Sequence, residues 1–231
     1  MKRFYKDVSI DRTEDGYRVL LDGKPVKTPG RNTLFLPKSA LAESIAREWD
    51  DQGDDIDPVS MPLLRLANTV QDGVAHTRPE VIAAVMRFAE HELLCYRASE
   101  PAELVARQAE VWDPMLDWAA RRYDARLSVA KGLMSVTQPA GALEKLREAV
   151  AGYDNYALAA LHVMASVTGS LVLALALADG AISPAQAFLL SRLDEDYQAE
   201  RWGADAEAVA RARALAREMN VATAFLAAAR D

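Results

Sequence analysis

Apolar and polar residues alternate along the first part of the chain, and over the rest the apolar residues recur every three or four positions. Residues 17–21 read YRVLL, with Tyr, Val and Leu at alternate positions. This alternation predicts a β-strand with one buried face. The Asp22-Gly23 pair that follows predicts a tight hairpin, because both turn residues adopt positive φ. We therefore expect a short antiparallel meander within residues 3–36.

A helix is expected directly after the meander. Leu41, Ile45 and Trp49 recur at i, i+4 and i+8, so they share one face of a helix that Gly53 ends. A sheet this small is not stable alone, and we expect it to pack on a helix. The acidic stretch 54–58 then marks the expected domain boundary.

The chain beyond this boundary is predicted to be helical, with interruptions. Residues 61–74 have helical character, whereas 127–137 lack it and are expected to form a loop or a short strand. The Asp113-Pro114 pair indicates either a kink or a new helix that Asp113 caps. A charge-free run at 157–178 is expected to be one helix from about residue 154 to 180.

The C-terminal helices are marked by their capping residues. A capping box at 183–186 begins a helix that is expected to run to Trp202, where Gly203 stops it. Asp205 is expected to cap a last helix that ends near residue 229. These elements predict an α+β, predominantly α-helical fold. Its domains are expected to be 1–57, with the meander and one helix, and 58–231, which is helical.

The charge-free run is long enough to span a membrane. However, it is rich in Ala, it holds polar residues near its middle, and Asp154 and Asp179 rather than Lys or Arg flank it. A central helix that other helices surround explains this pattern better, so we expect no stable membrane insertion.

Charge and cysteine content limit the possible partners. The net charge is -7, which opposes nucleic-acid binding. Residues 1–40 nevertheless carry nine Lys or Arg against five Asp or Glu, and the remainder is acidic. Cys95 is the single cysteine, which fits a reducing compartment and excludes a disulfide within the chain.

Motifs for catalysis or cofactor binding are missing from the sequence. It contains no Gly-rich phosphate-binding pattern and no nucleophile elbow, so we expect no cofactor and no enzymatic activity. The alternative is an all-α metal-dependent enzyme that uses His91, Glu92 and the acidic run 194–200. In a helix, His91 and Cys95 would share a face, but a zinc site needs three or four ligands and nothing nearby supplies them. A surface His beside a buried Cys is the simpler interpretation.

The acidic run has two interpretations of its own. Asp196 and Glu200 lie at i and i+4, so one helix face concentrates negative charge. That face is either solvated or functional, and a functional face would be a docking surface for a basic partner or a divalent-ion site. Trp202 beside it has the composition of an interface anchor.

Several strings taken together resemble a known family, in order and spacing, over nearly the whole chain. They are YRVLLDGKPVKTP (17–29), LAESIAREWDDQ (41–52), MPLLRL (61–66), LCYR (94–97), Gln108 with WDP (112–114), and LDEDYQAERWGAD (193–205). The set resembles the F-type ATP synthase assembly chaperones that bind the unassembled α subunit. The resemblance implies an N-terminal β-containing domain, a C-terminal helical domain, and a chaperone that covers free α subunit until β displaces it.

The resemblance also implies the partner-binding residues. The family's acidic-Trp-Gly motif falls on Glu200, Trp202, Gly203 and Asp205, with Asp196 in the same acidic run, and Trp49 and Gln52 match its other marked string. Because the first residues have no transit-peptide character, we expect a bacterial cytoplasmic protein.

Overall fold

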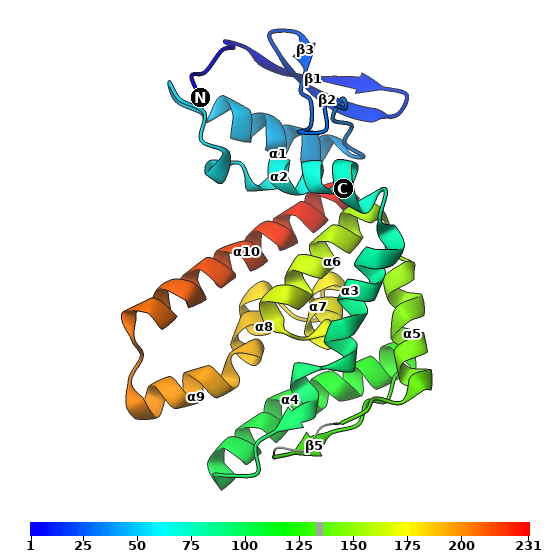
Figure 1. Ribbon diagram of the computed structural model, residues 1–231, viewed down its shortest axis with the longest axis vertical. Coiled ribbons are helices and arrows are strands. Elements are labelled where there is room, and N and C mark those ends of the chain that lie inside the picture. Colours follow the sequence, from blue (N-terminus) through cyan, green and yellow to red (C-terminus); the bar gives the residue numbers. More distant parts are fainter. Residues whose placement is uncertain (133–135) are drawn as a thin grey trace. The chain divides into compact units, whose positions relative to one another are not determined.

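Helices make up 63% of the chain, and a small antiparallel sheet forms near its N-terminus, which confirms the predicted fold class (Figure 1). The structure is a computed structural model that describes residues 1–132 and 136–231. The contacts divide the chain into two units. Unit 1 comprises residues 1–78, 155–160 and 224–231, and unit 2 comprises residues 79–154 and 161–223.

Unit 1 is built on the predicted meander and hairpin. Its elements are β1 (Val8–Thr13), β2 (Gly16–Leu21), β3 (Lys24–Pro25), α1 (Ser39–Asp50), the 3-10 turn η1 (Pro58–Ser60), α2 (Pro62–Thr69) and the π-helical turn η2 (Val70–Val74). The strands pair antiparallel in the order β1-β2-β3, with Leu21 opposite Lys24. Between them Asp22 and Gly23 have φ values of 48° and 75°, which confirms the hairpin turn.

The sheet packs on α1, as predicted. Val19 and Leu21 are buried on one face of β2, and Leu41, Ile45 and Trp49 are buried on α1. A carboxylate then joins α1 to the next helix. The two oxygens of Glu48 accept hydrogen bonds from the backbone N–H groups of Leu63 and Leu64, both at 2.8 Å, in the first turn of α2.

Residues 58–78 therefore belong to unit 1, beyond the boundary expected at residue 57. The side chain of Asp72 also connects residues 58–78 to the earlier part of unit 1. Asp72 accepts hydrogen bonds from the Thr28 hydroxyl at 2.7 Å, from Gly30 N–H at 2.7 Å and from the Asn32 amide at 3.1 Å. Whether residues 1–57 and 58–231 fold as separate domains stays a prediction.

Unit 2 contains most of the helices. Its elements, some of which extend into unit 1, are α3 (Arg78–Glu90), the 3-10 turn η3 (Leu93–Cys95), β4 (Tyr96–Arg97), α4 (Ala102–Tyr123), β5 (Ala130–Lys131), α5 (Ala140–Ala151), α6 (Asn155–Thr168), α7 (Leu171–Ala178), α8 (Pro184–Ser191), α9 (Leu193–Trp202) and α10 (Ala206–Arg230). β4 and β5 pair in parallel, which confirms a short strand within 127–137. Residues 133–135 of that segment lie outside the described residues.

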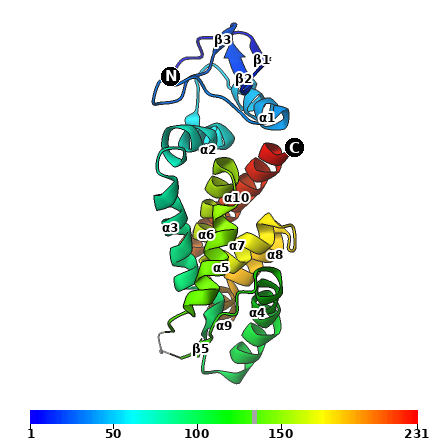
Figure 2. The same cartoon turned by 90° about the vertical axis from the view of Figure 1, so that its right-hand side faces the viewer.

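The charge-free run forms two helices, so the prediction of one continuous helix was wrong. Gly169 has a φ of 66° and ends α6, and the Ser170 hydroxyl caps α7 by accepting from Leu173 N–H at 2.9 Å. Every residue of α7 is buried, and this helix contacts α4 and α8 (Figure 2). Within residues 1–132 and 136–231, every helix is either too short or too polar to traverse a lipid bilayer.

The helix that was expected to run from the capping box at Ser183 to Trp202 is also two helices. The capping box is confirmed, but α8 ends at Ser191 and α9 begins at Leu193. The Trp112 indole N–H on α4 donates to the carbonyl oxygen of Leu190 at 2.8 Å, and so occupies an acceptor that a continuous helix would use.

Asp113 does not begin a new helix, because α4 runs through Pro114 without a break. Instead of capping, the Asp113 carboxylate accepts a hydrogen bond from the Arg97 guanidinium at 2.7 Å.

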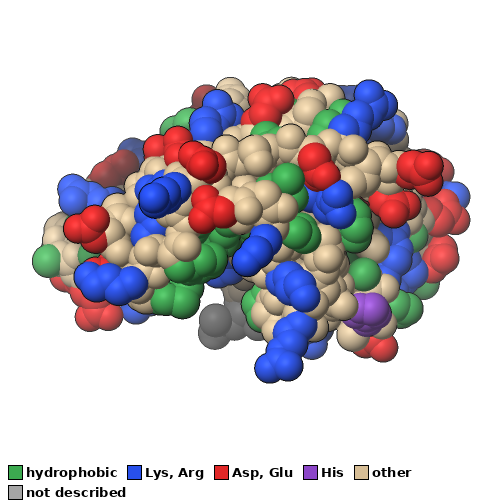
Figure 3. Space-filling model, turned by 90° about the horizontal axis from the view of Figure 1, so that it is seen from above, with side chains coloured by type: hydrophobic (Ala, Val, Ile, Leu, Met, Phe, Trp, Pro, Cys, Tyr) green, Lys and Arg blue, Asp and Glu red, His purple; other side chains and the backbone are tan. Residues whose placement is uncertain are grey.

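Basic and acidic side chains are interspersed over the face drawn in Figure 3.

Candidate functional site

The predicted acidic-Trp-Gly motif occupies α9 and the turn that follows it. Asp194, Glu195 and Asp196 lie in the first turn of α9, where the helix dipole stabilises negative charge. Gly203, with a φ of 83°, ends the helix, as predicted. The Asp205 carboxylate then accepts from Ala208 N–H at 2.8 Å and so caps α10, which is also as predicted.

Ion pairs hold α9 against α4. Arg107 on α4 pairs with Glu200 at 2.7 Å and with Glu103 at 2.9 Å, and Glu103 in turn pairs with Arg201 on α9. We call these four residues the α4–α9 clamp. All four side chains are about half exposed, so each ion pair alone contributes little to the stability of the fold. The pairs hold α9 against α4 mainly because they form a connected network.

A tyrosine lies at the centre of the clamp. The guanidinium carbons of Arg107 and Arg201 lie 5.3 Å and 4.8 Å from the centre of the Tyr197 ring, which is buried. Beside it, the Gln108 side chain donates to Asp194 at 2.7 Å, close to the start of α9. One face of α9 is therefore fixed to α4 by charge, by aromatic contact and by a hydrogen bond.

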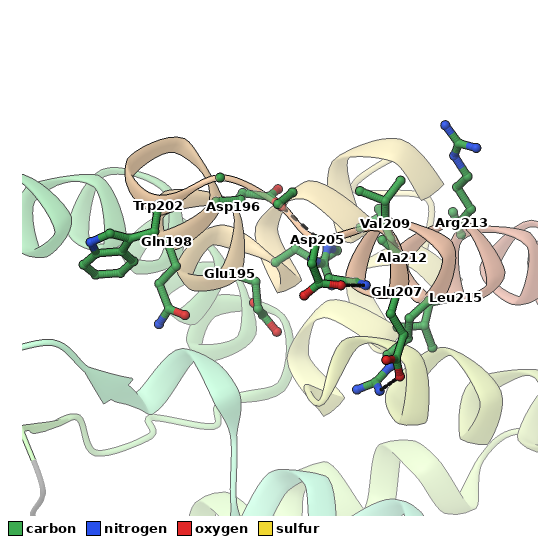
Figure 4. Close-up of a pocket in the computed structure, with 18 residues that line it drawn as sticks. Glu195, Asp196, Gln198, Trp202, Asp205, Glu207, Val209, Ala212, Arg213 and Leu215 are labelled. Atoms are coloured by element: carbon green, nitrogen blue, oxygen red, sulfur yellow. Dashed lines mark hydrogen bonds and ion pairs between the residues drawn. The ribbon is translucent and has the colours of Figure 1, made fainter.

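The opposite side of α9 borders an open groove shared with α8 and α10. The groove has a volume of about 780 Å³. Figure 4 shows Gln198 and Trp202 projecting from α9, and Val209, Ala212 and Leu215 on α10. Trp202 is 77% exposed, which is unusual for so large an apolar side chain. We call this feature the α9–α10 groove.

The structure brings together most of the predicted partner-binding residues but gives them different surroundings. Asp196, Trp202, Gly203 and Asp205 line the α9–α10 groove. Glu200 is directed to α4 instead, where it pairs with Arg107. Partner contact by any of these residues stays a prediction.

Trp49 and Gln52 lie in unit 1, where both have structural contacts. The carbonyl oxygen of Trp49 accepts from the Tyr5 hydroxyl at 2.6 Å. The Gln52 side chain donates to Glu48 O and Ser60 Oγ, both at 2.9 Å, and accepts from Asp57 N–H at 2.7 Å. Gln52 therefore joins the end of α1 to η1, and its role in partner binding is likewise untested.

The geometry that the metal-enzyme alternative needs is not present. α3 ends at Glu90, so His91 and Cys95 do not share a helical face. His91 is exposed and Cys95 is buried, as the simpler interpretation expected. Outside residues 133–135, no three His, Cys, Asp or Glu side chains gather in a way that could hold a metal ion.

Glu92 has a structural role that the sequence did not indicate. Its carboxylate is fully buried and accepts hydrogen bonds from Leu94 N–H at 3.3 Å and from Val172 N–H at 3.1 Å, in the first turn of α7. Burial raises the pKa of this carboxyl to about 7, although the hydrogen bonds it accepts oppose the shift. Glu92 thus joins η3 to the start of the buried helix.

Glu103 and Arg107 also support α9, a role that the sequence did not reveal. The only local signal was their opposite charge at i and i+4 on one helix face. Nothing in that spacing indicates a partner in α9, where Glu200 lies 93 positions after Arg107.

Comparison with known proteins agrees with this architecture. The family model for the ATP12 chaperone protein matches residues 2–120. The crystal structure of Atp12 from Paracoccus denitrificans is 43% identical to this chain, covers 99% of this chain and 98% of its own, and superimposes with a TM-score of 0.96. A solved structure from Agrobacterium tumefaciens is 45% identical, covers 98% of this chain and 85% of its own, and gives a TM-score of 0.93.

A more distant relative extends the likeness to eukaryotes. The mitochondrial protein atp12 of Schizosaccharomyces pombe is 23% identical over 214 residues, which cover 87% of this chain and 74% of the yeast protein. Together these likenesses define the class of protein: an ATP synthase assembly chaperone. The chain belongs to the ATP12 chaperone family.

Proposed function

We propose that this chaperone binds the free α subunit of the F-type ATP synthase and shields its subunit interface until the β subunit displaces it. Membership of the ATP12 family is the observation that carries the proposal. A ring subunit made before its neighbour exposes a large apolar interface that promotes aggregation. A protein that covers this interface lowers the concentration of exposed subunit by mass action and needs no catalytic step.

The α9–α10 groove is the proposed docking surface. Its exposed Trp202 has the size and amphipathic character of an interface anchor, and it projects from α9, which the clamp holds against α4. Asp196, Gly203 and Asp205 line the same groove. Release follows if β binds the same face of α more tightly than the chaperone does.

We place this activity in the bacterial cytoplasm. The solved relatives from Paracoccus denitrificans and Agrobacterium tumefaciens support the bacterial part of this proposal.

Co-expression tests the proposal. The α subunit is produced with and without this chain, and the soluble and co-purified fractions are measured. We expect α to stay soluble and to co-purify with the wild-type chain. Equal aggregation of α in both cultures would refute the proposed function.

A matched pair of variants tests the groove. Trp202→Ala removes an exposed side chain that lines it, and Leu189→Ala removes one that is 63% exposed on α8 but outside the lining. Trp202→Ala is expected to weaken α binding by about tenfold or more, whereas Leu189→Ala leaves it unchanged. Equal effects would contradict the assignment of the groove.

A further inference from the structure

Unit 1 contains a small pocket that is separate from the α9–α10 groove. Its volume is about 370 Å³, and its walls come from the N-terminal segment, the β2–β3 hairpin and the end of α1. The residues that matter here are Phe4, Tyr5, Lys24, Pro25, Lys27 and Trp49. This size is at the lower end of ligand sites, which span roughly 300–1,000 Å³, and suits one or two side chains of a peptide.

Aromatic rings form one wall of the pocket. The rings of Phe4 and Tyr5 meet edge to face with centroids 5.4 Å apart, and those of Tyr5 and Trp49 do the same at 5.5 Å. Tyr5 and Trp49 are buried, but Phe4 is 63% exposed. An exposed phenylalanine at the mouth of an aromatic pocket offers a site for an apolar side chain.

The segment that directly precedes Phe4 is held in place by contacts with residues 54–56. Arg3 N–H donates to Asp54 O at 2.9 Å, and Ile56 N–H donates to Met1 O at 2.7 Å. The Lys2 ammonium pairs with Asp55 at 3.0 Å. The exposed ring thus follows a backbone segment that is already held, which lowers the cost of ordering this part of the chain when a ligand binds.

The rim of the pocket is basic. Among the ion pairs of the described residues, none includes Lys24 or Lys27. The one acidic residue of the lining, Asp22, accepts hydrogen bonds from the backbone N–H groups of Lys6 at 3.0 Å and Asp7 at 2.9 Å. Both hydrogen bonds reach Oδ1 of Asp22, and together with the nearby charges of Lys6 and Lys24 they hold the pKa of this carboxyl below its usual range. Lys24 interacts with the Asp22 charge but forms no ion pair with it among the described residues, so both lysines can still attract an anion from outside.

We propose that this pocket binds a short acidic peptide segment that carries a large apolar side chain, and that this segment belongs to the client subunit. The assignment to the client rests on the proposed function. The apolar side chain packs against Phe4 and Trp49, while neighbouring carboxylates pair with Lys24 and Lys27. A nucleic acid fits less well, since two lysines neutralise few phosphates and the whole chain is acidic.

A peptide titration tests the chemistry of the pocket without the client. The probe is an end-blocked Glu-Asp-Phe-Asp-Glu peptide, and the control is Lys-Lys-Phe-Lys-Lys. The acidic peptide is expected to shift the backbone amide NMR signals of residues 21–27 with a Kd of about 1 mM, and the basic peptide is not. Shifts confined to other residues, no shifts at all, or equal shifts with both peptides would overturn the inference.

Charge reversal gives the matched variants. Lys24→Glu/Lys27→Glu is expected to weaken binding of the acidic peptide and of the α subunit by about tenfold each at low salt. Arg12→Glu/Arg31→Glu makes the same change of charge in unit 1 outside the pocket lining, and is expected to change either affinity by less than about twofold. A Phe4→Ser variant is expected to lose peptide binding with little change in stability, because the ring is exposed.

The results separate this inference from the proposed function. If wild-type chain does not bind α at all, the proposed function fails. If wild-type chain binds α and the Lys24→Glu/Lys27→Glu variant binds it equally well, only the inference about this pocket is overturned.

Discussion

Glu200 on α9 accepts a hydrogen bond from the Arg107 guanidinium on α4 at 2.7 Å, although 93 positions separate the two residues in the sequence. The family resemblance marks Glu200 as a partner-binding residue, and the structure shows it paired within the chain. Two roles of Glu200 therefore make different predictions: direct contact with a client, and positioning of α9 through Arg107.

A charge swap distinguishes these two roles. Glu200→Arg is expected to break the pair and to lower the melting temperature by no more than about 2 °C, because the pair is exposed. Adding Arg107→Glu restores opposite charges. If Glu200 positions α9, the double variant regains α binding in a pull-down assay. If Glu200 touches α, the double variant stays as defective as the single one.

A control for this swap is available on α10. Arg211 pairs with Glu207 at 3.4 Å, and both side chains are highly exposed. Arg211→Glu is expected to leave the melting temperature unchanged, since exposed pairs within one helix contribute little. A comparable loss of stability in this variant would mean that net charge, rather than the clamp, explains the effect.

Removal of Glu48 is expected to destabilise the chain. Its carboxylate caps the start of α2 through two backbone N–H groups, and Glu48→Ala leaves both without this acceptor. By analogy with other helix caps, we expect a loss of about 1–2 kcal/mol in the free energy of unfolding, measured by urea denaturation. Glu43→Ala makes the same change at an exposed position of α1 and is expected to be neutral. Equal stability of the two variants would disprove the capping role.

Glu92 makes stability depend on pH. Its folded pKa of about 7 lies above the value of 4.5 expected in the unfolded chain. The folded state therefore binds the proton more tightly, and the stabilisation is complete below pH 4.5 and is lost as pH rises through about 7. The loss is of the order of 3 kcal/mol, at 1.36 kcal/mol for each pKa unit.

The measurement compares wild-type chain with Glu92→Gln between pH 5 and pH 8.5. The free energy of unfolding of the wild type should fall relative to that of the variant as pH rises. His162 acts in the opposite sense, because burial lowers its pKa, and the comparison cancels its contribution. Parallel pH profiles for the two proteins would show that Glu92 does not titrate in this range.

Two tryptophans should differ in their contribution to stability. Trp112 is fully buried on α4 and donates to Leu190 O, whereas Trp202 is 77% exposed. Trp112→Ala is expected to cost about 3–5 kcal/mol of unfolding free energy. Trp202→Ala is expected to change it by less than about 0.5 kcal/mol, as for other exposed positions. A large loss with Trp202→Ala would mean that this side chain supports α9 rather than a docking surface.

The predictions that succeeded from sequence depend on neighbouring residues. The Asp22-Gly23 turn, the Ser183 capping box and the stop at Gly203 are each made by groups within a few positions of one another. Local chemistry of this kind is fixed once the residues are given. The sheet, the first helix and the ends of several later helices could therefore be read directly from the sequence.

The predictions that failed depend in part on residues far along the chain, although Gly169 and Ser170 also end α6 and cap α7 locally. The break between α6 and α7 lies where Glu92 binds the start of α7, and the break between α8 and α9 lies where Trp112 binds Leu190 O. In both places a distant side chain takes a backbone group that a continuous helix would use for itself.

The sequence alone thus determined the fold class, the turns and caps, and the family resemblance, because these follow from local patterns and from short strings in order. Only the tertiary structure decided which distant side chains bind the backbone at the two helix breaks, that Glu200 pairs with Arg107, and that Trp202 borders an open groove. Each of those depends on which groups meet in space, and periodicity along the chain does not specify that.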